Sequence, residues 1–270
     1  MIRDCSLNKT EFARISGIAR SMLYYEHRQP PKDWWLKQRI EIVLREHPSY
    51  GHKRLALHLE ANRKRILRVM HIFGIKPFRR RGRKYRKTKD YSIRYPNLLL
   101  TEYPQYKNHI WASDFTYLKY KKRIVYLATV IDLFTKEIMG FSVMLSHSVS
   151  LTLNALLSAI KDHSVPVILH SDQGSEYKSG DYIALEDNLG IRISMSKKAS
   201  PWENGYQESF YSQFKVDLGD PNRFSSLGEL VWAIYKTIHS YNNTRIHTAL
   251  KMPPAIFSQR HQERSSLLME

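Results

Sequence analysis

The chain has little cysteine and no long apolar run, and each shortage excludes a class of protein. Cys5 is the only cysteine among 270 residues, so no internal disulfide can form and a cysteine-based zinc site is excluded. No stretch approaches the roughly 20 apolar residues that cross a bilayer. The first residues, MIRDCSLNKT, lack the apolar run of a signal peptide. These absences predict a soluble, cytoplasmic protein with no membrane partner.

Acidic residues are also scarce relative to basic ones. The sequence holds 43 Lys and Arg against 25 Asp and Glu, a net charge of +18. Lysine and arginine laid on phosphates release condensed counterions, so this excess favours a polyanionic partner over a generally basic surface. Nine of the basic residues fall between Lys76 and Lys89, where there is no acid. Apolar residues make up 42% of the chain, enough to build a core.

The start of the chain predicts a small helical module at 1–30. Residues 8–27 read as two short helices, the first capped by Thr10 and the two separated at Gly17. This length suits a helix-turn-helix, although a plain helical hairpin has the same pattern. Pro30 and Pro31 then separate this module from the next.

A second helical module is predicted at 31–75, with helices at 35–46, 50–60 and 62–73. Asn62 is a candidate N-cap for the third helix, and Gly74 a candidate stop. The polar face of this helix is basic, which indicates DNA contacts or an ordinary solvated face; its candidate DNA-binding residues are Arg63, Lys64, Arg65 and Arg68.

A basic linker is predicted at 76–100, since the run at 77–92 has no apolar periodicity. Tyr85 and Tyr91 could stack on bases or pack locally. The candidate DNA-binding residues of the linker are Arg79, Arg80, Arg81, Arg83 and Lys84.

The remaining residues predict an α/β domain at 101–260, with a tail at 261–270. β-Branched and aromatic residues predict antiparallel strands at 109–120, 123–132 and 137–145. A helix at 150–162, a strand at 165–171, a helix at 180–189 and a strand at 191–196 follow, then helices at 202–217 and 226–243. The order βββ-α-β-α-β-α-α predicts a mixed five-stranded sheet flanked by helices.

Three acidic residues in this domain form a candidate metal site. Asp114 lies inside the first strand, where an unpaired carboxylate is costly unless it binds a cation. Asp172 directly follows an apolar strand and precedes Gly174, the position where α/β sheets place ligand groups. Glu208 lies in a helix, on one face with Asn204 and Lys215. Three such carboxylates can hold two hard cations that promote phosphodiester cleavage and transfer.

Other acids offer alternatives for the same site. Asp132 and Glu137 lie near the first reversals of the sheet, and Asp132 could be structural. Glu176 and Asp181 could be loop or capping residues. Composition alone does not separate these acids from Asp114.

The sequence motifs around the three acids resemble those of a known protein family. The sequence reads WASDFTY around Asp114, HSDQGSEY around Asp172 and SPWENGYQESFYSQFK around Glu208, with 35 residues between Asp172 and Glu208. These words and this spacing resemble the catalytic core of retroviral integrases and, more closely, the insertion-sequence-three family of bacterial transposases. The segments CSLNKTEFARISGIARSMLYYEHRQP, HPSYGHKRLALHLEANRKRILRVMHIFGI and YNNTRIHTALKMPPAIF extend the resemblance over nearly the whole chain.

The resemblance implies an RNase H-like core and a DNA transposase. Asp114, Asp172 and Glu208 map onto the metal-binding catalytic triad, with two Mg²⁺ or Mn²⁺ ions, and Lys215 maps onto a DNA-contacting residue. His170 is a candidate hydrogen-bonding residue behind the triad, or a packing histidine. Asn204 is a candidate DNA contact or a support for its helix, and Arg245 and His247 are structural or phosphate-facing.

The implied activity is metal-dependent strand cleavage and strand transfer on the terminal inverted repeats of an insertion sequence and on target DNA. The family's route is copy-out, paste-in through a circular intermediate. It implies a homo-oligomer on DNA, association with the nucleoid, and an upstream-frame partner or fusion that carries another helix-turn-helix and a leucine zipper. The alternatives are a DNA-binding regulator without catalysis, one acting only through its helix-turn-helix modules, and a nuclease of the same fold that does not join ends.

Overall fold

The structure, a computed structural model, describes residues 8–24, 29–78, 95–197 and 205–267. At the N-terminus, α1 (Lys9–Ile15) is followed by η1, a 3-10 helix at Arg20–Tyr24. Gly17 has φ of 64° and breaks the chain between them, as predicted. The helix is capped by Asn8, whose side chain accepts from the Thr10 backbone N–H, so the assignment of Thr10 as the cap was wrong.

The helical module consists of α2 (Gln29–Glu46), α3 (His52–His58) and α4 (Arg63–Ile72). Pro30 and Pro31 do not separate two units as predicted, because α2 already begins at Gln29. Proline fits the first helical turn, where its missing N–H would have had no intrahelical partner. Asn62 caps α4, and Gly74, with φ of 64°, follows its end; both predictions are confirmed.

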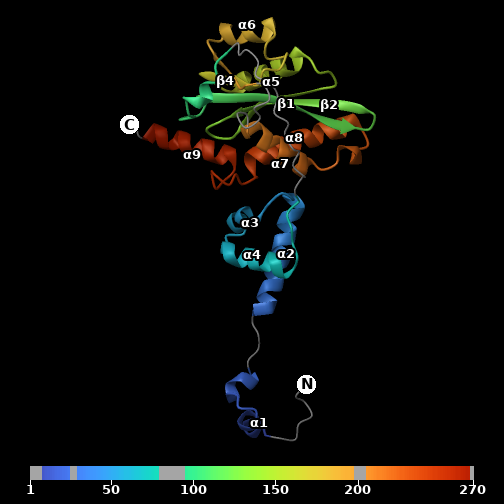
Figure 1. The fold of residues 1–270 in the computed structure, drawn as a ribbon, viewed down its shortest axis with the longest axis vertical. Helices are drawn as coiled ribbons and strands as arrows, with labels where there is room; N and C mark the ends of the chain where they lie inside the picture. Colours follow the sequence, from blue (N-terminus) through green and yellow to red (C-terminus); the bar gives the residue numbers. More distant parts are fainter. Residues whose placement is uncertain (1–7, 25–28, 79–94, 198–204, 268–270) are drawn as a thin grey trace.

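This module has its own apolar core. Ile40 of α2, Leu55 of α3 and Ile66 and Val69 of α4 are fully buried against one another. Figure 1 shows the three helices packed together below the sheet-containing domain.

The larger domain is built on a five-stranded sheet with the order β3-β2-β1-β4-β5. The first three strands are antiparallel, and β4 and β5 run parallel to β1. All five predicted strands are present, as β1 (Ile110–Tyr120), β2 (Arg123–Asp132), β3 (Ile138–Met144), β4 (Ile168–Ser171) and β5 (Arg192–Met195). Lys121 and Lys136 adopt positive φ in the two tight reversals that join the antiparallel strands.

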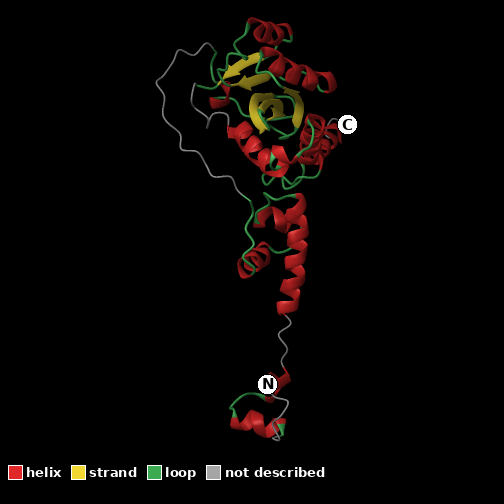
Figure 2. Cartoon of the chain, turned by 90° about the vertical axis from the view of Figure 1, so that its right-hand side faces the viewer, coloured by secondary structure: helices red, strands yellow, loops and turns green. Residues whose placement is uncertain are grey.

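Helices cover both faces of the sheet (Figures 1 and 2). One face packs on α5 (Val149–Asp162) and α6 (Gly180–Asn188), and the other on α7 (Gly205–Leu218) and α8 (Leu227–Asn243). Two apolar clusters fill these layers, one around Trp111 and Leu169 and the other around Leu127 and Phe214. This is the RNase H-like α/β arrangement that the sequence predicted.

Two boundaries differ from those predicted. Residues 98–100 form η2, a 3-10 helix (Leu98–Leu100) that packs on the sheet, so the last part of the expected linker belongs to the core. The Leu98 N–H donates to Ser194 Oγ at 2.9 Å. Helix α9 (Pro254–Leu267) continues past residue 260, where a tail was expected. No helix among the described residues is long and apolar enough to cross a membrane.

Candidate active site

The pairing of β1 with β4 brings Asp114 and Asp172 together. These strands are parallel, and their pairing ends at Ala112 opposite His170. Asp114, inside β1, and Asp172, the first residue after β4, each lie two residues beyond this last pair. The parallel register therefore predicts neighbouring positions on one face of the sheet. Residues 58 positions apart in the sequence are thus brought near each other by the pairing of β1 with β4.

Short local hydrogen bonds orient both carboxylates. Asp114 Oδ1 accepts from the Phe115 N–H at 2.8 Å, and Asp172 Oδ1 accepts from the Gly174 N–H at 2.8 Å. Gly174 leaves room in this turn, since a Cβ there would lie 3.0 Å from Asp172 Oδ1 and 2.9 Å from Glu176 Oε2. The glycine predicted beside the second acid therefore makes room for two carboxylates.

Helix α7 carries Glu208 and is seated across β1 by two buried side chains. Gln207 donates to the Ala112 carbonyl at 2.6 Å and to the Thr129 carbonyl at 3.2 Å. Tyr211 donates to the Asp114 carbonyl at 2.6 Å. Glu208 directly follows Gln207 and is exposed beside this seam.

Gln207 and Tyr211 are site residues that the sequence motifs did not indicate. The signal was available, since they are polar, lie one helical turn apart, and share the buried side of α7 with Phe214. A polar pair on an apolar helix face predicts bonds to the strand beneath it.

Burial and neighbouring charges raise the pKa values of both aspartates. Burial raises the pKa of Asp114 to about 8, and the charges of Asp172 and Glu208 add to this increase. The Phe115 N–H and Lys215 act in the opposite direction. Burial also raises the pKa of Asp172, the Gly174 N–H opposes this, and Glu176 raises it further. A bound cation would lower the pKa values of both aspartates, because it favours their ionised forms.

The three acids do not form a closed ligand set in this structure. Within the described residues, no group of three acidic or histidine side chains is placed to hold one metal ion. Asp114 and Asp172 are held by their strands, whereas Glu208 is exposed on α7. The structure therefore brings the two aspartates together and leaves Glu208 as a nearby third acid.

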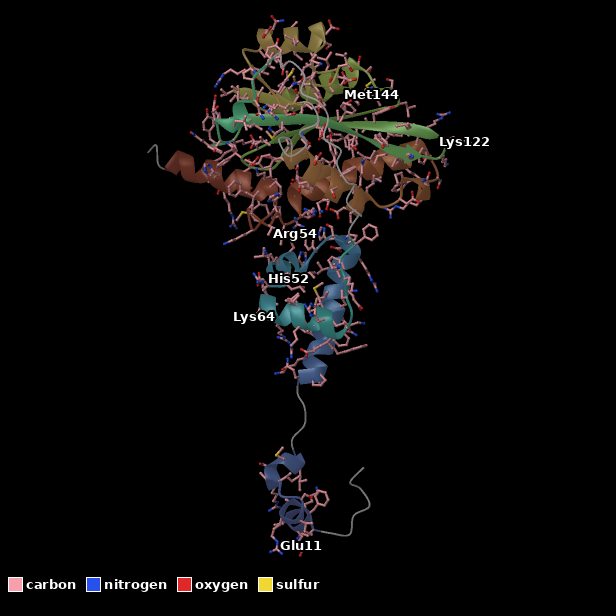
Figure 3. All side chains as sticks on the ribbon, in the orientation of Figure 1. Glu11, His52, Arg54, Lys64, Lys122 and Met144 are labelled. Atoms are coloured by element: carbon pink, nitrogen blue, oxygen red, sulfur yellow. The ribbon has the colours of Figure 1, made fainter. Side chains whose placement is uncertain are left out.

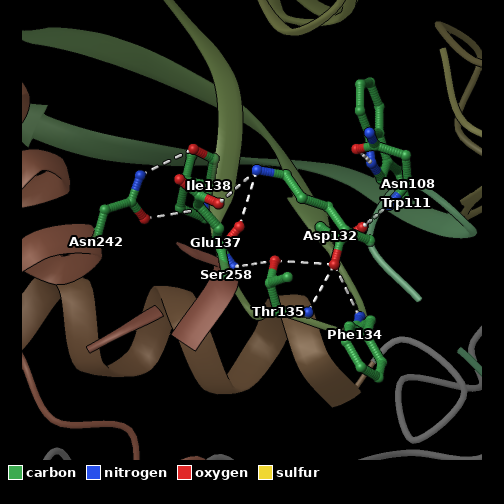
Figure 4. A network of polar contacts seen from close by, with 10 residues as sticks. Asn108, Trp111, Asp132, Phe134, Thr135, Glu137, Ile138, Asn242 and Ser258 are labelled. Atoms are coloured by element: carbon green, nitrogen blue, oxygen red, sulfur yellow. Dashed lines mark hydrogen bonds and ion pairs between the residues drawn. The ribbon is translucent and has the colours of Figure 1, made fainter. Parts of the chain in front are cut away.

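Asp132, the strongest alternative, is structural. Its Oδ1 accepts from the Phe134 N–H at 3.0 Å and from the N–H and hydroxyl of Thr135 at 2.6 and 2.9 Å. Its Oδ2 accepts from the Asn108 N–H at 2.8 Å. Figure 4 shows this carboxylate at the centre of a network that closes the turn after β2. Four donors saturate the group, so it is not available to a ligand.

The other alternative acids also have local roles. Glu137 pairs with Lys107 at 3.4 Å, and Asp181 lies in the first turn of α6. Glu176 is buried, accepts from the Ser175 hydroxyl at 3.0 Å and pairs with His147 at 3.1 Å. Glu176 is the one of these acids whose charge reaches the Asp172 carboxylate.

His170 packs behind the site. It is fully buried, and its Nδ1 lies 2.8 Å from Ser194 Oγ on β5. This contact joins β4 to β5 and supports the strand that ends at Asp172. Of the two roles considered for His170, hydrogen bonding behind the acids is the one its position favours.

Lys215 and Arg245 make internal contacts. Lys215 donates to Thr116 Oγ1, and its ammonium lies 5.4 Å from the centre of the Tyr117 ring. Arg245 is buried and bonds Asp217 at 2.8 Å and Gln213 at 2.9 Å. Of the two roles considered for Arg245, the structural one is supported by these bonds.

The candidate DNA-binding residues of α4 are exposed, but two of them contact α2. Arg68 pairs with Asp33 at 2.6 Å, and Arg65 donates to the Lys32 carbonyl at 3.4 Å. Arg63 and Lys64 lie on the exposed face at the start of the helix. The remaining candidates lie outside the described residues: Asn204, Arg79, Arg80, Arg81, Arg83 and Lys84.

Comparison with known proteins identifies the family of the chain. Residues 104–201 and 189–254 each match the integrase core domain family. The chain is 34% identical over 240 residues to the transposase for insertion sequence element IS904 of Lactococcus lactis, covering 83% of this chain and 94% of that protein. It is 32% identical over 256 residues to the putative transposase InsK for insertion sequence element IS150 of Escherichia coli, covering 89% of each.

The catalytic core domain of HTLV-2 integrase in complex with magnesium is also similar in structure. It is 23% identical, with a TM-score of 0.44, and the likeness covers 57% of this chain and 97% of that one.

Proposed function

Because this chain belongs to the insertion-sequence transposases of the integrase superfamily, we propose that Asp114, Asp172 and Glu208 form its catalytic centre for cutting and joining DNA. The observation that supports the proposal is the β1–β4 register, in which two half-buried aspartates follow the last paired residues at equivalent positions, next to the helix that bears Glu208. Two further observations support it. The charges of Asp172 and Glu208 act on Asp114, and the sequence spacing of the three acids matches the family.

The donor set fits Mg²⁺ or Mn²⁺. Both ions prefer hard oxygen ligands, and the three side chains offer carboxylates alone. The raised pKa of Asp114 is the expected state of such a carboxylate without a cation beside it. Asp114 and Asp172 would hold the ions from the rigid strands, and Glu208 would complete the set from α7. Two divalent ions would activate the attacking oxygen and stabilise the leaving oxygen of an in-line phosphodiester displacement.

The residues of the chain position these ligands. Gly174 leaves space for the Asp172 carboxylate, Gln207 and Tyr211 fix α7 to β1, and His170 steadies the end of β4 through Ser194. We propose two steps at this site. Water first hydrolyses a phosphodiester at an element end and frees a 3′-hydroxyl. This hydroxyl then attacks the phosphorus of a phosphodiester in target DNA and becomes bonded to it, while the 3′-oxygen of the cut target strand leaves as a hydroxyl.

Lys215 and the exposed basic residues of α4 are the proposed DNA contacts beside this centre. Lys215 already lies along β1 through Thr116, on the side of α7 that bears Glu208. We further propose that the substrate is the terminal inverted repeats, that the enzyme works as a homo-oligomer on DNA, and that an upstream-frame product acts with it.

The test is Asp172→Asn in the full chain, which keeps the size of the side chain and the acceptor for the Gly174 N–H. Metal-dependent cleavage and joining of element-end DNA should be lost, because Asn is a poor ligand for a hard cation. DNA binding should stay near normal or strengthen slightly through reduced repulsion. Asp181→Asn, which changes an exposed acid of α6, is the matched control and should cut normally.

Cleavage by Asp172→Asn at the wild-type rate would contradict the proposed centre. Binding without any Mg²⁺- or Mn²⁺-dependent product from the wild-type chain would favour a regulator that lacks catalysis. Cleaved ends without joined products would favour a nuclease of the same fold.

A further inference from the structure

A cavity of about 630 Å³ lies between the helical module and the core, apart from the catalytic carboxylates. Arg54 of α3 lines it from the module, and α7, the end of α8 and the segment after α8 line it from the core. Figure 3 labels Arg54 at the end of the module that faces the core. The residues of α7 in its wall include Tyr206, Ser209 and Gln213, which share one helix face, whereas Glu208 lies on another.

The wall of this cavity is cationic. Three cationic side chains line it, those of Arg54, Lys136 and Arg245, and its described lining residues include no Asp or Glu. Asp217 neutralises Arg245 at 2.8 Å. Arg54 and Lys136 make no ion pair of this kind with a described residue, and the Lys136 ammonium lies 3.9 Å from the centre of the Tyr206 ring. The Lys136 ammonium also donates to the Leu133 carbonyl, and the charges of Asp132 and Asp217 act at a distance on Lys136 and Arg54. The two cations at the wall are therefore only partly compensated.

The pKa values support this description. Burial, with the charge of Arg245, lowers the pKa of Arg54 to about 10, and burial lowers that of Lys136 to about 8. Both groups are still mainly protonated at pH 7. Burial followed by the charge of Lys136 lowers the pKa of His247 to about 4, so this imidazole is neutral.

Two polar atoms at the cavity are buried without a hydrogen-bond partner among the described residues. They are Nε of Arg54 and Nδ1 of His247. Buried polar atoms are nearly always bonded, and an unsatisfied one indicates a missing water, ion or ligand. A buried guanidinium N–H calls for an acceptor, and the nearby positive charges favour one that is anionic.

We propose that this cavity binds a backbone phosphate of DNA, held by Arg54 and Lys136. Phosphate oxygens supply both the acceptors and the negative charge that the wall lacks. The Ser209 hydroxyl and the Gln213 amide add neutral donors to the wall. DNA is the favoured source of the phosphate because the chain belongs to a family of DNA transposases and carries a net charge of +18. This proposal rests on the proposed activity on DNA, but it does not require that the three acids bind metal.

The consequence concerns how DNA is held. A phosphate in this cavity contacts the helical module through Arg54 and the core through Lys136, so one contact bridges both parts. Such a contact is independent of sequence, and it positions the duplex without reading its bases.

The test compares Arg54→Gln and Lys136→Gln with two matched controls in the full chain. Lys53→Gln removes an exposed cation from the adjacent position of α3. Lys251→Gln removes an exposed cation from a backbone with φ of 61°, close to the 63° of Lys136. Each variant is first checked for wild-type thermal unfolding. Binding of a short labelled duplex is then measured by fluorescence anisotropy over a range of salt concentrations.

Each cavity variant should lower the slope of log affinity against log salt by about one unit, as expected for the loss of one phosphate contact. The controls should keep the wild-type slope. Equal changes in all four variants would overturn the proposal, since general surface charge would then explain binding. Unchanged slopes in both cavity variants would also overturn it.

Two further measurements distinguish a DNA phosphate from other anions that could occupy the cavity. Calorimetric titration with inorganic phosphate that depends on Arg54, with DNA binding unaffected by Arg54→Gln, would assign the cavity to free phosphate and overturn the DNA assignment. A changed oligomeric state by light scattering, with unchanged DNA binding, would assign it to a carboxylate of another chain and overturn it as well. Normal cutting by Asp172→Asn would contradict the catalytic proposal but not this one.

Discussion

Gly174 shows how a residue without a side chain can leave the room in which a carboxylate of the candidate centre is placed. Its missing Cβ leaves space between Asp172 Oδ1 and Glu176 Oε2, two atoms that a Cβ would approach to 3.0 and 2.9 Å. The Asp172 side chain is short, so it cannot move away without changing the position of its carboxylate.

Gly174→Ala should therefore reduce cleavage on the order of a hundredfold, the effect of misplacing a catalytic group by about 1 Å. Thermal unfolding should change little by comparison, since the affected atoms are carboxylate ends. Single-turnover cleavage at saturating Mg²⁺ measures the effect. Gly180→Ala, with nothing within 4 Å of its added Cβ, is the control. Full activity in Gly174→Ala would show that the turn is not needed to hold Asp172.

Glu186 is a buried acid that the catalytic site does not use. It is 1% exposed on α6, its Oε2 has no hydrogen-bond partner among the described residues, and burial raises its pKa to about 8. The unfolded chain releases this proton near the ordinary value of 4.5. Between these two values the folded state binds more protons, so the stability that Glu186 contributes is lost as pH rises toward about 8.

Glu186→Gln should remove this loss because glutamine stays neutral. The variant should melt at a higher temperature than the wild type at about pH 9, and the difference should shrink as the pH falls toward about 4. Calorimetry across this range measures it. Asp162→Asn tests whether loss of an exposed carboxylate does the same. A difference that does not vary with pH would contradict the buried-acid explanation.

At the scale of elements, the sheet and its helices are joined by close backbone contacts as well as by side chains. Gly140 of β3 lies against α5, where a Cβ would come within 2.4 Å of the Ala159 nitrogen and 2.6 Å of the Ala155 carbonyl oxygen. Neither atom belongs to a flexible side chain, so the helix as a whole would have to move.

Gly140→Ala should lower the free energy of unfolding by at least roughly 1–3 kcal/mol, the usual cost of overpacking a core. Urea unfolding followed by circular dichroism measures it. Gly228→Ala, whose Cβ would meet only Ser226 Oγ at 3.8 Å in the first turn of α8, should be neutral or slightly stabilising. Equal stability of the two variants would mean that α5 can shift on the sheet at little cost.

At the scale of the whole molecule, the helical module is bonded to the core. Arg245 donates to Ser49 Oγ at 3.0 Å while pairing with Asp217, and the Ile246 N–H donates to the Tyr50 hydroxyl at 2.7 Å. Tyr50 is fully buried. These contacts connect the turn between α2 and α3 to the segment after α8. Arg245, which makes one of them, also lines the phosphate cavity proposed above.

Tyr50→Phe should leave the Ile246 N–H without its acceptor, at a cost of roughly 1–3 kcal/mol. Hydrogen exchange should quicken at this junction before it changes in the sheet, and the melting temperature should fall. Tyr103→Phe, at a residue 71% exposed, should change neither quantity. Wild-type exchange at Ile246 in Tyr50→Phe would mean that another group accepts its hydrogen bond.

The sequence by itself determined the elements of the core and indicated the three candidate acids. Alternation of apolar residues is a local property, so the strands and most helices were predicted close to their observed bounds. The spacing and flanking words of Asp114, Asp172 and Glu208 indicated the family. Other features were less accurate: the extension of α2 through two prolines and the whole of α9 were missed, because packing contributes most of the stability of such helical segments.

Only the tertiary structure decided which acids meet. Asp114 and Asp132 both belong to antiparallel strands and look alike in sequence, yet β1 pairs with β4 beside Asp114, whereas four donors saturate Asp132. Gln207 fixes α7 to β1, and residues of α7 line the cationic cavity. Both features likewise depend on contacts between segments that are distant in the sequence. Local patterns do not specify such contacts, because strand register and helix docking are set by the combined packing of the whole core.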